Sequence, residues 1–344
     1  MRLPEFEVLV PQTLEEACSL LEKHASDGVK ILAGGTDLLV DLRQPIIPQH
    51  VPRCHGCQSH PEGQVRSTIE CGFWETDPKM AGNGSWRSAI SGGDNSHPAY
   101  LVSLHKLSSL KRIEVLEDGT LQIGALTTIT EIQRSEVIRE KWTALSEGAD
   151  KLGSPLVRNR GTLGGNLAHA RPAADMAAPT ITLGGMITLS SSTNERSLAA
   201  PDFPLAPGKT AAKADEILRA VTYPAPAPYS GSTYYKLANR KALDISTVGI
   251  AVYASLEEPG GPVSDVRVGL GAVAPKPIIA HTVKEVLIGK VPTEKLLDDA
   301  CDAAANDCRP IDDHRGSAWY RVQMVRTLTR RTLELALKRA GGTR

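Results

Sequence analysis

Two glycine pairs, each placed directly after an apolar segment, constrain the fold of this chain more than any other feature of its sequence. The first lies in KILAGGTDLLV, residues 30 to 40, and the second in RGTLGGNLAHARPAAD, residues 160 to 175. Adjacent glycines permit positive φ angles and can point successive backbone N–H groups at one position, which forms a donor site for phosphate oxygens. We therefore expect each pair to end a strand and begin a binding loop.

Other phosphate-binding motifs fit the sequence poorly. The tripeptide GKT at 208 to 210 would need a glycine at position 203 to form a phosphate loop, and that residue is Phe203. No G-x-G-x-x-G follows an expected strand, which disfavours a Rossmann dinucleotide site. A single glycine pair is more often a simple turn, so it is the presence of two such pairs that favours a ligand site.

The charge balance excludes several kinds of partner. The chain has 344 residues, with 39 Lys plus Arg against 39 Asp plus Glu, so it offers no basic field for nucleic acid or an anionic membrane. We expect no membrane span, because no apolar run approaches the length of about 20 residues that a spanning helix needs. The amino terminus lacks a signal-peptide pattern and the cysteines do not form a disulfide scaffold, so we expect a cytoplasmic protein.

The pattern of apolar residues predicts an α+β fold with two domains. We place a first domain at residues 1–223 and a C-terminal α+β domain at 231–344, joined by the proline-rich PAPAPYSG. STVGIAVYASL and DVRVGLGAV flank the turn EEPGG and predict a hairpin. Two closing helices are expected at about 293–306 and 317–340.

Residues 51–100 have a different composition and interrupt this pattern. They are rich in Gly, Ser, Pro and Arg and have no helical or alternating period, so we interpret them as an insertion. Cys54 and Cys57 in C-x2-C spacing, followed by Cys71, are consistent with a zinc or iron–sulfur site. The alternatives are an unstructured surface loop and a stretch that is no part of the working protein.

Five motifs together resemble one known family. LAGGTDLL, IGALTTITEI, TLGGNLAHARPAAD, YYKLANRKALDISTVGIAV and RGSAWYRVQMVRTLTRRTL occur in the order found in the FAD-binding medium subunit of the molybdenum hydroxylases, the family of xanthine dehydrogenase and aerobic carbon monoxide dehydrogenase. The resemblance implies a two-subdomain, PCMH-like FAD-binding region followed by a C-terminal domain of antiparallel sheet plus helices. One departure is Arg171, because relatives commonly carry an aspartate there. Some relatives bear an extra [4Fe-4S] cluster, but in an insertion after the second glycine segment, with four cysteines.

The resemblance also implies a set of site residues and partners. FAD would be held by Lys30, Ile31, Leu32, Ala33, Gly34, Gly35, Thr36 and Asp37 of the first segment, by Thr162, Leu163, Gly164, Gly165 and Asn166 of the second, and by Asp175 and Lys236. The partners would be a large molybdopterin-binding subunit and a small [2Fe-2S] subunit, assembled as a dimer of heterotrimers. Electrons would pass from the [2Fe-2S] clusters through FAD to an external acceptor, and no catalytic dyad is expected in this chain.

Two alternatives remain open at this point. One is a self-standing FAD oxidase with its substrate pocket in this chain, against which stands the lack of acid–base candidates. The other is a flavin-binding scaffold that only organises its partners. The role of His169 is also open between contact with the cofactor and a hydrogen bond to the backbone of its own loop.

Overall fold

The computed structural model describes residues 3–43 and 98–341. Its strands are β1 (Glu7–Leu9), β2 (Val29–Leu32), β3 (Tyr100–Ser103), β4 (Ile113–Val115), β5 (Leu121–Gly124), β6 (Met186–Ser190), β7 (Glu195–Ala199), β8 (Pro204–Ala206), β9 (Lys209–Thr210), β10 (Ile217–Tyr223), β11 (Ser230–Leu237), β12 (Val248–Leu256), β13 (Val263–Gly271) and β14 (Ile278–Ile279). Its helices are α1 (Leu14–Lys23), α2 (Leu38–Asp41), α4 (Ile129–Arg134), α5 (Glu136–Lys141), α6 (Thr143–Lys151), α7 (Pro155–Arg158), α8 (Leu163–Ala168), α9 (Ala177–Thr182), α10 (His281–Leu287), α11 (Glu294–Asp307) and α12 (Ala318–Gly341). The chain is therefore α+β, as the sequence predicts.

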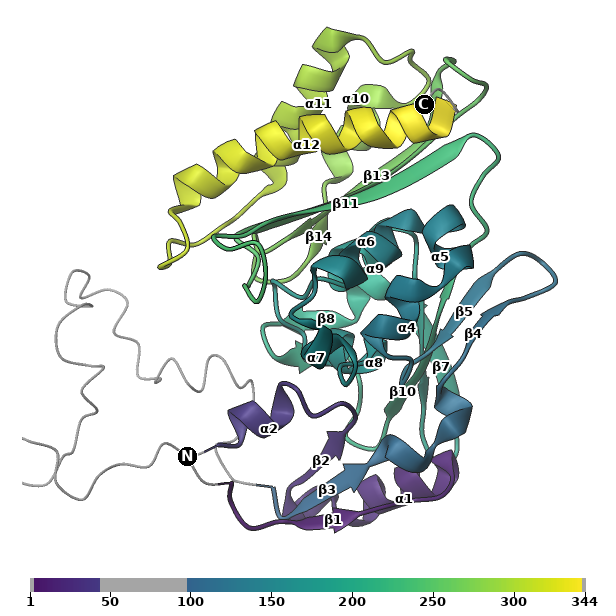
Figure 1. Ribbon diagram of the computed structural model, residues 1–344, viewed down its shortest axis with the longest axis vertical. Helices are drawn as coiled ribbons and strands as arrows, with labels where there is room; N and C mark the ends of the chain where they lie inside the picture. The colour runs from purple at the N-terminus through teal and green to yellow at the C-terminus, as the bar shows by residue number, and fades with distance from the viewer. Residues whose placement is uncertain (1–2, 44–97, 342–344) are drawn as a thin grey trace, which may run out of the picture.

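The first subdomain is a small parallel sheet covered by one helix. Its strands are ordered β1-β3-β2, and it lies at the opposite end of the molecule from the C-terminal helices (Figure 1). Helix α1 begins at the Thr13 cap, whose side chain accepts a hydrogen bond from the Glu16 amide at 3.1 Å. Ala17, Cys18 and Leu21 on one face of α1 are buried in the core of this subdomain.

The second subdomain is a five-stranded antiparallel sheet ordered β4-β5-β10-β6-β7. The chain leaves this sheet after β5, forms helices α4 to α9, and returns through β6 (Figure 1). Helix α4 has a complete capping box, in which Thr128 and Glu131 bond reciprocally. The helices from α6 to α9 lie between this sheet and the C-terminal domain, which places the second glycine pair near the middle of the molecule.

The C-terminal domain is a four-stranded antiparallel sheet ordered β11-β12-β13-β14. All nine residues of β12 are buried, because helices cover both faces of the sheet. Val248, Ile250, Val252 and Ala254 belong to the core under α12, whereas Ala251 and Tyr253 belong to the core that includes α6 and α9. The hairpin and both closing helices predicted from the sequence are confirmed.

A short connector joins β10 to β11. It begins at Pro224, whose carbonyl accepts a hydrogen bond from the indole N–H of the buried Trp142 at 3.0 Å. In the part of the chain that the structure describes, no helix is long and apolar enough to span a membrane.

Candidate functional site

The first glycine pair forms a tight turn between β2 and α2. Gly35 has a φ of +73°, a left-handed conformation that glycine reaches without strain. No described residue accepts a hydrogen bond from the backbone amides of residues 34–37, and all four residues line a cleft. Amides of a turn that lines a cleft, without an acceptor among the described residues, are available as donors for an anionic ligand. We call residues 34–37 the glycine turn.

The second glycine pair lies in the first turn of α8, so the expectation that it follows a strand is wrong. Thr162 is the N-cap of this helix, and its Oγ1 atom accepts a hydrogen bond from the Gly165 amide at 3.1 Å. The amides of Leu163 and Gly164 donate to backbone carbonyls of the turn before α4, at 3.0 and 2.9 Å. Because these three amides are already bonded within the protein, the second pair does not offer the amide cradle for phosphate that the sequence suggested.

Close packing is the reason for glycine at two of these positions. A Cβ atom on Gly164 would lie 2.7 Å from the Cβ of Ala125, and one on Gly34 would lie 2.1 Å from the carbonyl oxygen of Arg160. Both distances are far below van der Waals contact, so a side chain at either position would force the backbones apart. Gly34 therefore packs directly against the chain that leads into α8, and the two glycine segments, far apart in sequence, lie side by side.

The glycine turn and the start of α8 line a single cleft with a volume of about 1390 Å³. Typical small-molecule sites occupy about 300–1,000 Å³, so this cleft has room for an extended dinucleotide. It continues to loops of the C-terminal domain that include residues 243–246 and 272–275. The site residues expected from the sequence that line it are Lys30, Ile31, Ala33, Gly34, Gly35, Thr36, Asp37, Thr162, Gly164, Gly165, Asn166 and Asp175. Leu32, Leu163 and Lys236 are not part of this lining.

Two side chains of the second segment can donate hydrogen bonds into the cleft. Asn166 Oδ1 accepts a hydrogen bond from the Met176 amide at 3.2 Å, which orients the side chain and leaves its NH2 group as a donor. Thr162 uses its oxygen as the cap acceptor, and no described residue accepts its hydroxyl hydrogen. At this segment the donors for a ligand are therefore side chains and not backbone amides.

Asp175 is a buried acidic residue at the edge of the cleft. Its Oδ2 atom accepts a hydrogen bond from Lys236 Nζ at 2.7 Å, and Oδ1 accepts from Ser246 Oγ at 2.8 Å and Tyr234 Oη at 3.0 Å. Burial raises the pKa of Asp175, while the Lys236 ammonium and the two hydroxyls act in the opposite direction. Burial and the Asp175 carboxylate also raise the pKa of Tyr234 well above its ordinary value, so Tyr234 stays a neutral donor.

Lys236 is buried beside Asp175 and completes this polar cluster. Its Nζ atom also donates to the Lys151 carbonyl at 3.1 Å, and its side chain is only 6% exposed. Both expected residues are thus brought together, but each is bonded to protein groups. They fix the C-terminal sheet against the segment after α8, so the Asp175 carboxylate is already engaged by three protein donors.

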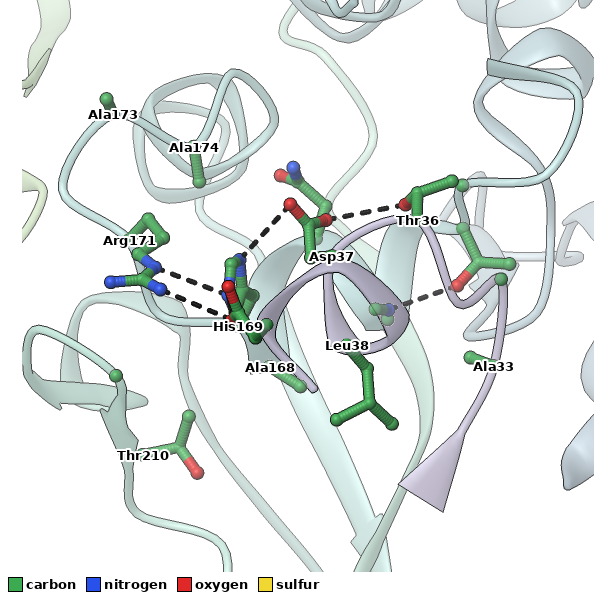
Figure 2. A pocket seen from close by; sticks show the side chains of 18 of the residues that line it. Ala33, Thr36, Asp37, Leu38, Ala168, His169, Arg171, Ala173, Ala174 and Thr210 are labelled. Carbon is green, nitrogen blue, oxygen red and sulfur yellow. Dashed lines mark hydrogen bonds and ion pairs between the residues drawn. The ribbon is translucent and has the colours of Figure 1, made fainter. Parts of the chain in front are cut away.

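Sequence reasoning missed a charged cluster formed by Asp37, Asp41, His169 and Arg171. All four residues line the cleft. Figure 2 shows the His169 ring and the Arg171 guanidinium beside helix α2. His169 contacts the two aspartates and not the backbone of its own loop. One signal was available: Asp37 and Asp41 are four residues apart, a spacing that places both side chains on one face of a helix.

The metal ligands expected in the insertion, Cys54, Cys57 and Cys71, lie outside the described residues. Within residues 3–43 and 98–341, no group of three or more His, Cys, Asp and Glu side chains is arranged to hold a metal ion. The zinc or iron–sulfur hypothesis for the insertion therefore stays a prediction.

Comparison with known proteins connects this cleft to flavin. The family model described as the FAD binding domain in molybdopterin dehydrogenase matches residues 78–226, and the model described as the CO dehydrogenase flavoprotein C-terminal domain matches residues 233–336. These matches, together with a cleft that unites a glycine turn and three subdomains, define an FAD-binding subunit of an oxidoreductase.

Individual relatives identify the family. The xanthine dehydrogenase FAD-binding subunit of Escherichia coli O157:H7 is 30% identical over 249 residues, 72% of this chain and 85% of the relative. The carbon monoxide dehydrogenase medium chain of Hydrogenophaga pseudoflava is 29% identical over 336 residues, 98% of both chains. The chain belongs to the family of FAD-binding medium subunits of the xanthine dehydrogenase and carbon monoxide dehydrogenase type.

Solved structures agree with this assignment. A carbon monoxide dehydrogenase from Hydrogenophaga pseudoflava superposes with a TM-score of 0.79 at 28% identity and covers 98% of this chain and 99% of the other. Quinoline 2-oxidoreductase from Pseudomonas putida 86 gives a TM-score of 0.77 at 26% identity and covers 99% of this chain and 100% of the other. The fold class predicted from the sequence is thereby confirmed.

Proposed function

We propose that this chain binds one FAD in the cleft and passes electrons between the [2Fe-2S] clusters of a small partner subunit and an external acceptor. The observation that carries the proposal is the glycine turn, which lines a cleft shared by all three subdomains and whose amides have no acceptor among the described residues. When bound, FAD supplies chemistry suited to this position, because it can take up electrons singly and release them as a pair.

The residues of the cleft suit the parts of FAD. The amides of the glycine turn are donors for the diphosphate oxygens, and Gly34, which packs against Arg160, has no side chain to cover its amide. Thr162 and Asn166 supply neutral donors beside this position. Asp175, which lines the cleft, and Lys236, which is not part of the lining, fix the C-terminal sheet at the other end of the cleft.

The proposed complex contains a large molybdopterin-binding subunit and a small [2Fe-2S] subunit, as a dimer of heterotrimers. Support comes from the names of the relatives, several of which are medium chains or medium subunits of dehydrogenases and hydroxylases. We also propose the cytoplasm as the location, and 1–223 and 231–344 as the two domains, joined by the connector after Tyr223.

The test is to mix the FAD-loaded chain with its reduced partner subunits under anaerobic conditions. The proposal predicts that the flavin absorption band bleaches and then recovers when an electron acceptor is added. A flavin that keeps its absorption would contradict electron transfer and favour a scaffold. Turnover of an organic substrate by the chain alone would instead favour a self-standing oxidase.

A further inference from the structure

Besides the packing of Gly34 on Arg160, apolar and charged contacts hold the first subdomain against the second. On one side an apolar cluster includes Leu21 and Leu104 of the first subdomain and Ile217 of β10. In the cleft lining, the charged side chains of helix α2 lie beside those of the segment after α8. In the described part of the chain, no backbone hydrogen bond joins residues 33–42 to residues 160–175. Side-chain polar contacts between these two segments are those of the charged cluster.

We call this cluster, Asp37, Asp41, His169 and Arg171, the α2–α8 clamp. Asp37 is the N-cap of α2 and Asp41 its last residue, while His169 is the C-cap of α8. Asp41 and His169 are 128 positions apart in the sequence, yet Asp41 Oδ2 lies 3.2 Å from His169 Nε2.

Arg171 and Asp37 complete the clamp. Arg171 Nη2 lies 3.4 Å from Asp41 Oδ2, and Arg171 Nε lies 3.3 Å from His169 Nε2. His169 Nδ1 lies 3.6 Å from Asp37 Oδ1. The His169 and Arg171 side chains are only 25% and 24% exposed, so these contacts are partly shielded from water.

We propose that the α2–α8 clamp fixes the glycine turn in its binding position, and that Arg171 is a positioning residue and not a flavin ligand. This inference rests on the proposed function. Helix α2 has only four residues and follows the glycine turn directly, so it cannot hold the turn by its own stability. The position of the turn amides therefore depends on what anchors α2, and the clamp supplies that anchor at both ends of the helix.

The same contacts could act in a second way, through the electrostatic field in the cleft. In that case Arg171 would attract the FAD diphosphate and Asp41 would repel it. The two roles predict opposite results for Asp41. Loss of the Asp41 charge weakens flavin binding if Asp41 anchors α2, and tightens binding if Asp41 only adds negative charge.

The experiment measures FAD affinity and release rate for full-length Asp41→Asn, Arg171→Gln and the double variant. We expect each single variant to bind FAD about three- to fivefold more weakly, the effect of losing a half-exposed ion pair. The loss of affinity in the double variant should be smaller than the sum of the two single losses, because the contact between Asp41 and Arg171 is lost in both single variants. Arg171→Lys should recover part of the affinity. In all of these variants the unfolding midpoint of the flavin-free protein should stay unchanged. Tighter or unchanged binding in Asp41→Asn would overturn the proposal.

A matched control is Arg326→Gln. Arg326 Nε lies 2.7 Å from Asp302 Oδ1, an ion pair of the same type between α12 and α11, outside the cleft lining. Its loss should leave flavin affinity unchanged, and an equal loss of affinity here would also overturn the proposal.

Amide hydrogen exchange of the flavin-free protein separates the clamp from the proposed function. Faster exchange at residues 38–42 in Asp41→Asn and Arg171→Gln supports the clamp even if the unsubstituted chain binds no FAD, a result that would overturn only the proposed function. Unchanged exchange at these residues would overturn the clamp.

Discussion

Lys236 Nζ lies 2.7 Å from Asp175 Oδ2, and this ion pair joins β11 of the C-terminal sheet to the segment between α8 and α9. The two side chains are 6% and 9% exposed. Tyr234 and Ser246 bond to the other carboxylate oxygen, so the pair is the centre of a fully bonded polar cluster. The geometry of this cluster determines the position of the C-terminal loops at the end of the cleft.

Replacing Lys236 with Met should therefore destabilise the protein strongly. The substitution leaves the Asp175 carboxylate buried without its countercharge, which costs about 3–5 kcal/mol in the free energy of unfolding. Urea denaturation near neutral pH measures this loss. Lys284→Met is the control, because the Lys284 side chain is 59% exposed in its pair with Asp265, and such a pair should contribute less than about 1 kcal/mol.

The same variant should be less destabilised in acid. Burial raises the native pKa of Asp175 above its ordinary 3.8, and without Lys236 the main opposing influence is gone. The native state then binds a proton more tightly than the unfolded state, so the free energy of unfolding falls as pH rises from the ordinary pKa to the raised one. The destabilisation should shrink when the pH is lowered through this window; a constant deficit would contradict the assignment.

Substitution of Gly34 with Ala should separate the glycine turn from α8. The new Cβ would lie 2.1 Å from the Arg160 carbonyl oxygen, so the backbone must move, at a cost of about 1–3 kcal/mol. We expect FAD affinity to fall by at least about tenfold, measured by flavin titration. Gly260→Ala provides the comparison, because it adds backbone strain at a φ of +75° but no clash, since nothing lies within 4 Å of the added atom. That change should leave the affinity as it is.

Thr162→Ala should affect both stability and flavin binding. Loss of the cap to the Gly165 amide costs about 0.5–2 kcal/mol, and the neutral donor beside the proposed diphosphate site disappears. Thr293 caps α11 in the same way through the Leu296 amide, outside the cleft. Thr293→Ala should reduce thermal stability similarly without changing FAD affinity. Equal effects of the two variants on affinity would argue against a binding role for Thr162.

The buried cysteines should be chemically inert in the folded protein. Burial raises the pKa to about 11 for Cys18 and Cys301 and to about 12 for Cys308. At pH 8 only about one thiol in a thousand or fewer would then be a thiolate, the reactive form. Mass spectrometry after brief alkylation should find these three residues unmodified in the native state and modified after unfolding. Rapid native labelling of any of them would contradict the buried placement.

Local signals in the sequence predicted much of this fold. The hairpin of β12 and β13 and the two closing helices depend on residues close in sequence, and all appear where expected. The glycine turn was also correctly placed after a strand. In such cases turn chemistry and periodicity agree with the tertiary structure, so local reasoning suffices.

The sequence could not predict the features of the fold that depend on long-range contacts. Gly164 is glycine because Ala125 packs against it, and this requirement is invisible without the fold. The same applies to the pairing of Asp175 with Lys236 and of Asp41 with His169 and Arg171, which bring together residues from different subdomains. A helical segment that begins with glycines has weak propensity, so the cap at Thr162 was a better guide than the residues after it.

The central claim is that one flavin lies against both glycine segments. A crystal structure of the chain with FAD tests it most directly. The account predicts the diphosphate oxygens within hydrogen-bonding distance of amides in residues 34–37, with the Thr162 or Asn166 side chain donating to the same group. A diphosphate bound elsewhere, or one that contacts neither the glycine turn nor the start of α8, would contradict it.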